Sequence, residues 1–490
     1  MKGKVLFPLA LAVVGMSSGE TVPDNAFGFR RPDPEGIEVI VNPKAELGPI
    51  KPVHGVNNGP MKARPDQCRG NFEAYRDARI PSARTHDAVF SQAYGGAHTI
   101  DISAVFPDFG ADADDPKNYD FHYTDFTLDN IQAAGTEVYY RLGQSIEHGG
   151  KKYHVGPPKD ALKWAKVCER LIRHCNEGWA DGKRRGIRHW EIWNEADNNS
   201  PDNPTCWGGT DEEFFAFYEV VAKHLKGCFP DLAIGGPAVG WNEDWARRFV
   251  EYAHTHGVPL DFFSWHGYDT EPRKVAAHAE RMRKLLDANG YTATESHLTE
   301  WNYVRGWSGE WVYSMRAESG DRQEKGAAYV AAVLTELQGS SVTLAHYYDA
   351  RPGTSMNGLF HPVTARTMRG YYPFYAWSNL RDLGTAVSAR VASPERDVYV
   401  TAARGGDDAL GVLVVRFDHD LNVIVPRRVD LRVNGRPVVG VRAHMTDYAS
   451  LYTEFHPLVK AEDTVSFMLE PNAFVYLEFP GRGEKKGEVK

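Results

Sequence analysis

The chain has 490 residues, and its 25% charged and 42% hydrophobic residues are an ordinary globular composition. Its formal charge of −9, without any long basic run, argues against nucleic acid as a partner, because neutralising a phosphate backbone requires clustered Lys and Arg. The length excludes one small domain and fits either one large domain with a smaller one or three of medium size.

The first residues are typical of a signal peptide, which we expect to cover residues 1–19. Lys2 and Lys4 precede the apolar run Val5–Val14, and small residues follow at Ser17–Gly19. The run is too short to span a bilayer, although it would also fit a short buried helix or strand. We therefore expect an exported protein, secreted or periplasmic, that inserts into no membrane.

Residues 51–382 alternate short apolar or β-branched runs with longer amphipathic ones, as expected of a mostly parallel sheet. Eight strands are expected, at Pro52–Asn57, Ile80–Asp87, Thr136–Gln144, Arg188–Asn194, Leu232–Pro237, Asp261–Tyr268, His297–Trp301 and Thr343–Asp349. Helical patterns lie between them, and Asp160 and Asp211 stand where helix N-caps are expected. Eight such pairs predict an α/β fold, a (β/α)8 TIM barrel.

After Leu383 the helical pattern ends and apolar residues alternate with polar ones. Strands are expected at Asp397–Ala402, Leu410–Arg416, Arg428–Val433, Thr464–Leu469 and Phe474–Phe479. This pattern predicts an accessory antiparallel β-sandwich over residues 383–480. Residues 20–50 are expected to pair with it through Ile37–Val41, and the charged tail 481–490 is expected to fray.

The cysteines give no sign of a disulfide framework, because their number is odd and their spacing is wide. The five are Cys68, Cys168, Cys175, Cys206 and Cys228. The sequence also contains no CxxC or HExxH pattern. We therefore expect neither a metal nor a cofactor.

Nearly every expected barrel strand ends in polar or aromatic residues. These ends are Asn57-Asn58, His86-Asp87, Asn194-Glu195, His266 with Tyr268, Glu300 with Asn302, and Tyr348-Asp349. Active sites of such barrels are built from the C-terminal strand ends. The pattern therefore predicts an active site on that face.

The sharpest candidate is Glu195, at the end of the fourth strand in the segment His189–Asp197. Trp190 and Trp193 lie close to it in the sequence. A carboxyl in partly apolar surroundings has a raised pKa and can act as a general acid near neutral pH. An isolated Asn-Glu is also common at surface turns, but this setting favours the catalytic interpretation.

Glu300 ends the seventh strand, and taken alone it is as compatible with a structural role as with a catalytic one. Strands four and seven face each other across an eight-stranded barrel, so Glu195 and Glu300 are expected to point into one cavity. Carboxyls about 5–5.5 Å apart would support retaining glycoside cleavage, whereas roughly 6.5–9.5 Å would indicate inversion.

From about Ile37 onward the chain resembles glycoside hydrolase family 39. The resemblance is carried by Arg84-Thr-His86, Trp193-Asn-Glu195, Gly235-Gly-Pro237, Ser264-Trp-His-Gly-Tyr268 and Thr299-Glu-Trp-Asn302. It implies a retaining enzyme with Glu195 as acid/base and Glu300 as nucleophile. One departure is Ala196, where the family usually has Pro, and this puts the substrate subtype in doubt.

The resemblance also implies a set of substrate-binding residues around these two carboxyls. The set is Asn194, His266, Tyr268, Arg84, His86, Trp301 and Asn302. A nucleophile must stay ionised, so Arg84 and Tyr268 are expected within hydrogen-bonding reach of Glu300. Asn194 and His266 are expected to contact sugar hydroxyls.

The expected partner is an oligosaccharide or glycoside, cleaved by an exo-acting glycosidase of the β-xylosidase type. An α-L-iduronidase would need a cation for the uronate, which Arg305 or Arg351 could supply. A glycoside hydrolase of a related family in the same clan, such as an endo-glucanase or arabinofuranosidase, is a further alternative. A catalytically retired, carbohydrate-binding barrel would be expected to have lost one carboxylate, and both are present here.

Overall fold

The computed structural model describes residues 36–62, 70–86, 98–147, 149–198, 204–305, 323–352, 356, 358–393, 395–420 and 422–481. The expected signal peptide, Cys68, Asp87 and the tail from residue 482 lie outside the described residues.

Eight parallel strands close into a barrel in the order of the sequence, which confirms the predicted fold. They are β2 (Gly55–Asn57), β3 (Ser82–Thr85), β4 (Glu137–Leu142), β5 (His189–Ile192), β6 (Ala233–Val239), β7 (Phe262–Asp269), β8 (Glu295–Tyr303) and β9 (Val342–Tyr347). Every strand overlaps a range expected from the sequence. The C-terminal ends of the strands therefore meet on one face of the barrel.

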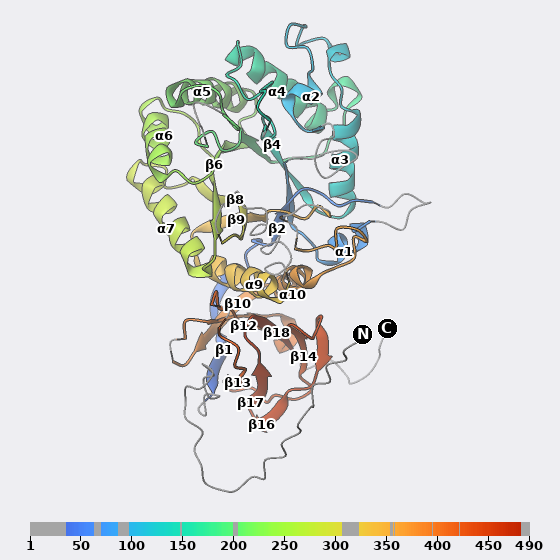
Figure 1. Ribbon diagram of the computed structural model, residues 1–490, viewed down its shortest axis with the longest axis vertical. Coiled ribbons are helices and arrows are strands. Elements are labelled where there is room, and N and C mark those ends of the chain that lie inside the picture. The colour runs from blue at the N-terminus through green and yellow to red at the C-terminus, as the bar shows by residue number, and fades with distance from the viewer. Residues whose placement is uncertain are drawn as a thin grey trace, which may run out of the picture.

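Helices surround the barrel, as Figure 1 shows. They are α1 (Phe72–Asp77), α2 (Ile102–Val105), α3 (His122–Ala133), α4 (Ala161–Asn176), α5 (Asp211–Cys228), α6 (Glu243–Thr255), α7 (Pro272–Ala288), α9 (Glu324–Gly339) and α10 (Tyr372–Leu383), with 3₁₀ turns η1 (Pro116–Asn118), η2 (Trp179–Asp181), η3 (Arg369–Tyr371) and η4 (Gly406–Asp408). Asp160 caps α4 by accepting a bond from the Lys163 backbone N–H. The cap of α5 is Thr210 rather than Asp211, because Thr210 and Glu213 form a reciprocal capping box.

The remaining strands form one ten-stranded sheet below α9 and α10 (Figure 1). In spatial order they are β15 (Thr453–Phe455), β14 (Arg442–Thr446), β18 (Ala473–Phe479), β12 (Leu410–Arg416), β11 (Val398–Arg404), β10 (Thr385–Val391), β1 (Ile37–Pro49), β13 (Arg427–Val433), β17 (Thr464–Leu469) and β16 (Leu458–Ala461). The sheet is antiparallel except where β1 runs parallel to β13. Strand β1 precedes the barrel in sequence, yet it lies in the interior of this sheet.

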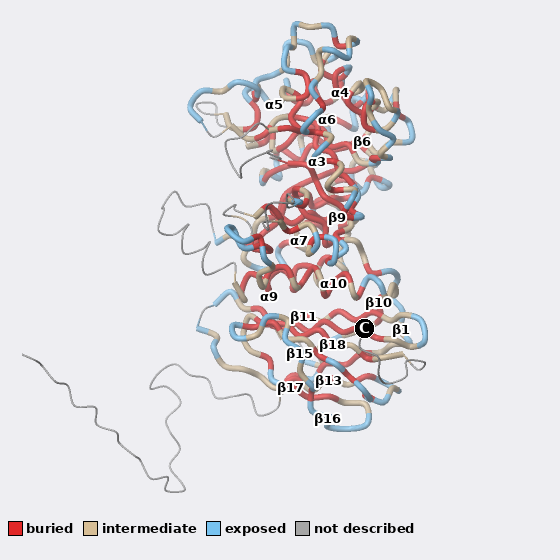
Figure 2. The backbone as a smooth tube through the Cα atoms, turned by 90° about the vertical axis from the view of Figure 1, so that its right-hand side faces the viewer, coloured by how far each residue is buried: buried red, intermediate tan, exposed pale blue. Residues whose placement is uncertain are grey.

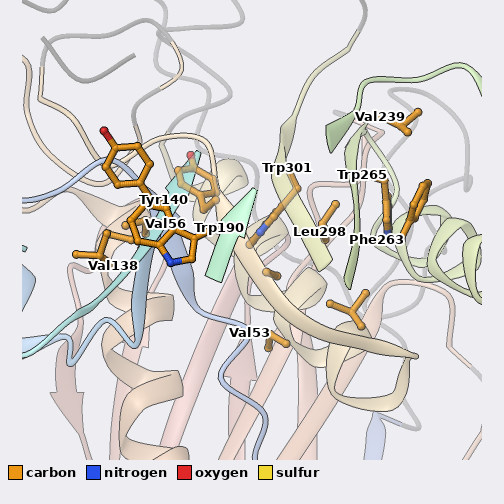
Figure 3. Close-up of a cluster of buried hydrophobic side chains, with 14 of the residues drawn as sticks. Val53, Val56, Val138, Tyr140, Trp190, Val239, Phe263, Trp265, Leu298 and Trp301 are labelled. Carbon is orange, nitrogen blue, oxygen red and sulfur yellow. The ribbon is translucent and has the colours of Figure 1, made fainter. Parts of the chain in front are cut away.

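Two separate apolar clusters hold the molecule together, and buried backbone fills the interior of both parts in Figure 2. The larger lies between the barrel strands and the helices, with side chains such as Val138, Tyr140, Trp190, Phe263, Trp265 and Leu298 (Figure 3). The smaller is formed mainly by side chains of the ten-stranded sheet and includes Val39 and Val41 of β1. Burying one such side chain stabilises a fold by about 1.5–3 kcal/mol. Among the described helices, none is both long and apolar enough to cross a bilayer.

Candidate active site

A β-bulge in β8 decides where Glu300 points. Opposite β7, Trp265 pairs with Leu298, but the next residue, His266, pairs with Glu300, so Thr299 is extra. Leu298 and the residue after Glu300 both pack into the outer apolar cluster. Strict alternation from Leu298 would turn Glu300 outward as well, and an extra residue reverses the direction of the side chains after it. The bulge therefore turns Glu300 into the barrel.

The carboxylate of Glu300 is buried and held at both oxygens. Its Oε1 accepts a hydrogen bond from Arg84 Nη1 at 2.9 Å, and its Oε2 accepts one from the Tyr268 hydroxyl at 2.6 Å. The Nε2 atoms of His86 and His266 lie 3.2 and 3.6 Å from Oε1. Arg84 and Tyr268 thus stand where the sequence led us to expect them.

Burial dominates the electrostatics of Glu300 and holds its pKa above the ordinary value. The neighbours His266 and Arg84 pull that pKa back down, the nearby Glu195 raises it, and the hydrogen bond from Tyr268 lowers it. The ionised form of Glu300 therefore depends on its donors.

The guanidinium of Arg84 donates hydrogen bonds to four side chains, one of which is Glu300. Its Nε donates to Glu191 Oε2 at 2.5 Å, its Nη1 donates to Asn57 Oδ1 at 3.0 Å as well as to Glu300, and its Nη2 donates to Asn194 Oδ1 at 2.7 Å. Burial alone would lower the pKa of Arg84, but the carboxylates of Glu191 and Glu300 outweigh it and raise the pKa. The guanidinium of Arg84, for which the sequence predicted a substrate contact, is fully buried and makes its hydrogen bonds inside the protein.

Glu191 was not expected in the site, although it lies only four residues before Glu195. Its side chain is fully buried inside the barrel, next to Arg84, whereas the adjacent Trp190 packs into the outer cluster. A signal was present, because an arginine that faces a barrel interior needs a counter-charge at the same level. Glu191 supplies that charge.

Glu195 lies beyond the end of β5 on backbone with positive φ, 74° at Trp193 and 49° at Glu195 itself. Its Oε1 lies 2.7 Å from His266 Nδ1, and its Oε2 accepts a bond from Asn198 Nδ2 at 3.3 Å. The side chain is 12% exposed, against 5% for Glu300. Glu195 is therefore the more accessible of the two carboxyls.

His266 connects the two carboxyls. Ligand atoms of Glu195, His266 and Glu300 all lie within 4.8 Å of one another, so one oxygen of each carboxyl is that close to the other. Burial lowers the pKa of His266, and Arg84 adds to this effect, although Glu300 opposes it. A neutral imidazole thus separates two carboxyls that are too close to ionise together without cost.

Asn194 and His86 complete the inner wall of the site. The Oδ1 of Asn194 is held by Arg84, while its buried Nδ2 finds no hydrogen-bond partner among the described residues. This buried amide N–H therefore has a donor capacity that the described residues do not use. His86 is fully buried, and its ring centroid lies 5.7 Å from that of Tyr348.

Trp301 and Asn302 do not stand where substrate contacts were expected. Trp301 is fully buried in the outer apolar cluster (Figure 3). Its ring lies edge-on to that of Tyr347. The bulge that turns Glu300 inward sends Trp301 outward. Asn302 Nδ2 donates to the carbonyl oxygens of Tyr348 and Met356 at 2.5 and 2.8 Å. Its amide therefore fixes the loop after β9.

The two arginines considered for a uronate differ in their surroundings. Arg351 Nη2 pairs with the fully buried Asp349 at 2.8 Å, so its charge is balanced inside the protein. Arg305 is exposed beyond the end of β8. Of the pair, only Arg305 lies at the surface.

The family model for glycosyl hydrolases family 39 matches residues 84–347, more than half of the chain. A β-xylosidase of Geobacillus stearothermophilus is 25% identical over 232 residues, 41% of this chain and 44% of that protein. A β-xylosidase of Caldicellulosiruptor saccharolyticus is 29% identical over 209 residues, 38% of this chain and 41% of that protein. The matched regions thus span less than half of these relatives.

Among solved structures, a glucosidase from Croceicoccus marinus superimposes with a TM-score of 0.72. The match covers 90% of this chain and 98% of that one, at 19% identity. At this identity the likeness establishes a shared fold, barrel and accessory sheet together.

Proposed function

Because the chain belongs to glycosyl hydrolases family 39, we propose that it hydrolyses O-glycosidic bonds with retention, Glu195 acting as acid/base and Glu300 as nucleophile. The observation that carries the proposal is the approach of the two carboxyls to within 4.8 Å. Nearest oxygens at this distance fit the separation of about 5–5.5 Å between the carboxyl groups of retaining enzymes better than the roughly 6.5–9.5 Å of inverting ones.

In the first step the Glu300 carboxylate attacks the anomeric carbon while Glu195 gives its proton to the leaving oxygen, and the glycosidic C–O bond breaks. The sugar is then an ester of Glu300. In the second step Glu195 takes a proton from water, which attacks the same carbon and releases Glu300. The Asn194 N–H contacts a sugar hydroxyl during both steps.

The surroundings of the two carboxyls support this division of roles. Arg84 and Tyr268 donate to Glu300 and favour its ionised form. Beside Glu195 lies the imidazole of His266, which burial keeps neutral. Hydrogen bonds from a cation and a hydroxyl favour the ionised form of the carboxyl that accepts them, which supports Glu300 as the nucleophile and leaves Glu195 for the acid.

For the substrate we propose a β-xylosidase-like, exo-acting enzyme on plant-type or related oligosaccharides. The names of both curated relatives support the sugar. The balanced charge of Arg351 removes one of the two cations considered for a uronate, and the presence of both carboxyls weighs against a retired barrel. Export through residues 1–19 is part of the same proposal.

The test is a panel of p-nitrophenyl glycosides, with the first-formed anomer identified by proton NMR. We expect the β-xyloside to have the highest kcat/KM and the β-anomer to appear first. An α-anomer as first product would refute retention. No turnover of any glycoside would indicate a binding protein.

A second test uses Glu195→Ala, which removes both the acid and the base. Substrates with poor leaving groups should slow by about 10²–10⁴-fold, the usual contribution of general acid–base catalysis. Activated aryl glycosides should form the glycosyl-enzyme and then stall. Azide should restore turnover and give a glycosyl azide of retained configuration, whereas an inverted azide would contradict the assignment.

A further inference from the structure

Trp241, between β6 and α6, is an exception among the described tryptophans. Its side chain is 69% exposed, while the other described tryptophans are buried or half-buried. In the described part of the chain its ring contacts no other aromatic ring. A single exposed aromatic ring is ordinary on a protein surface, so what this ring can bind depends on its position in the molecule.

The backbone that carries Trp241 is held firmly. Asp197 is buried, and its carboxylate accepts hydrogen bonds from the backbone N–H groups of Gly240, Trp241 and Asn242 at 2.7, 3.0 and 2.9 Å. Asn242 in turn caps α6 by accepting a bond from the Trp245 N–H at 3.0 Å. The exposure of the ring is thus a property of a fixed segment.

The same segment touches Glu195. A Cβ placed on Gly240 would lie 3.2 Å from the Cγ, Cδ and Oε1 atoms of Glu195, so the glycine leaves just enough room for that carboxyl. The Glu195 backbone N–H donates to the Ala238 carbonyl at 2.9 Å. Asp197, two residues after Glu195, completes the connection. The Glu195 carboxyl and the exposed indole of Trp241 are therefore carried by segments that hydrogen bonds hold together.

We propose that Trp241 is the stacking platform for the sugar ring of the leaving group. This inference rests on the proposed function. Glu195 delivers its proton to the leaving oxygen, so the residues beside it border the leaving group, whereas those beside Glu300 border the sugar that becomes attached. A flat indole suits the apolar C–H face of a pyranose ring. Trp241 then favours oligosaccharides over glycosides with small leaving groups.

The test compares two substrates that differ in the leaving group alone, β-xylosyl fluoride and xylobiose. Fluoride is a single atom and cannot reach a platform. In Trp241→Ala we expect kcat/KM for xylobiose to fall about tenfold, the factor that one aromatic stacking contact supplies, while kcat/KM for the fluoride stays within about twofold. Trp241→Phe should recover most of the loss.

Tyr448→Ala is the matched control, because Tyr448 is a similarly exposed aromatic residue, at 67%, beyond the end of β14 in the ten-stranded sheet. This substitution should leave kcat/KM unchanged for both substrates. Methyl β-xyloside needs the same protonation by Glu195 as xylobiose but has no second sugar ring. A similar tenfold loss on methyl β-xyloside in Trp241→Ala would therefore show that the residue only supports Glu195, and no loss on xylobiose would also overturn the inference. A wild-type enzyme that cleaves neither substrate would refute the β-xylosidase function instead.

Discussion

At the scale of single residues, the site depends on how a buried carboxylate is kept ionised. Glu300 has its pKa raised by burial and lowered by its donors, among them Tyr268. The nucleophile must be ionised, so activity is lost on the acid side as pH falls through the pKa of Glu300. Any variant that removes a donor should move that limb of the pH profile upward.

Tyr268→Phe removes one hydrogen bond to Glu300 and keeps the ring. We expect the acid limb of the kcat/KM profile to move to higher pH by about one to two units, because a hydrogen bond to a charged group is worth about 1.5–3 kcal/mol. The alkaline limb should stay in place. An unchanged acid limb would mean that the hydroxyl does not act on the ionisation of Glu300.

Two buried carboxylates contact Arg84, and they are expected to differ in role. Glu300→Gln should lower kcat about a thousandfold or more, because the nucleophile is lost. Its Tm should change little, because burial raises the pKa of Glu300 and so already disfavours the charged form in the folded protein. Glu191→Gln should destabilise the fold by about 3 kcal/mol, because it breaks a fully buried ion pair, and should retain more activity. Thermal unfolding and single-turnover kinetics on both variants measure the difference. If Glu191→Gln lost more activity and Glu300→Gln more stability, the roles assigned to these two residues would be exchanged.

At the scale of elements, the strands could be predicted from the sequence and the bulge could not. Alternating short apolar and long amphipathic runs located all eight barrel strands, and the motifs located Glu195 and Glu300. The bulge leaves only a weak mark, two consecutive polar residues between Leu298 and Trp301, and such a pair also fits a strand end. For this reason Trp301 was expected in the site although it packs outside.

The same limit explains the other differences. Arg84 was expected near Glu300, but its depth in the barrel, which removes it from the substrate, depends on the level at which neighbouring strands meet. Asn302 was expected beside Glu300, but its partners lie on the loop after β9, far away in sequence. Of the sheet strands, β10, β14, β15 and β16 were not predicted, and three of these four are five residues or shorter.

The bulge itself can be tested at Thr299. Deleting Thr299 should turn Glu300 out of the barrel and abolish turnover. Thr299→Val is the matched control, because the buried Oγ1 has no hydrogen-bond partner among the described residues. This substitution should keep the activity and stabilise the fold by about 1 kcal/mol. Full activity of the deletion variant would contradict the role of the bulge.

At the scale of the whole molecule, β1 ties the start of the chain to the accessory sheet. Val39 is fully buried in β1 and lies opposite Val391 of β10 and Leu431 of β13. Val39→Asp should therefore cost about 3 kcal/mol or more, because it places an unpaired charge in the smaller core. Denaturant unfolding measures the loss. Glu38→Gln, at the neighbouring exposed residue, should lower the free energy of unfolding little. Equal losses in the Val39 and Glu38 variants would contradict the position of β1.

The position of β1 also has a consequence for biosynthesis. Ile37 pairs with Val429, so the entire barrel is translated between a strand and its partner. Translation proceeds at about 5–20 residues per second, so roughly 20–80 s pass between the synthesis of β1 and that of β13. Ile37-Glu-Val-Ile-Val41 is a β-prone apolar segment of the kind that aggregates when unpaired. Chains that terminate early should therefore be captured by chaperones through β1, even when their barrel is complete.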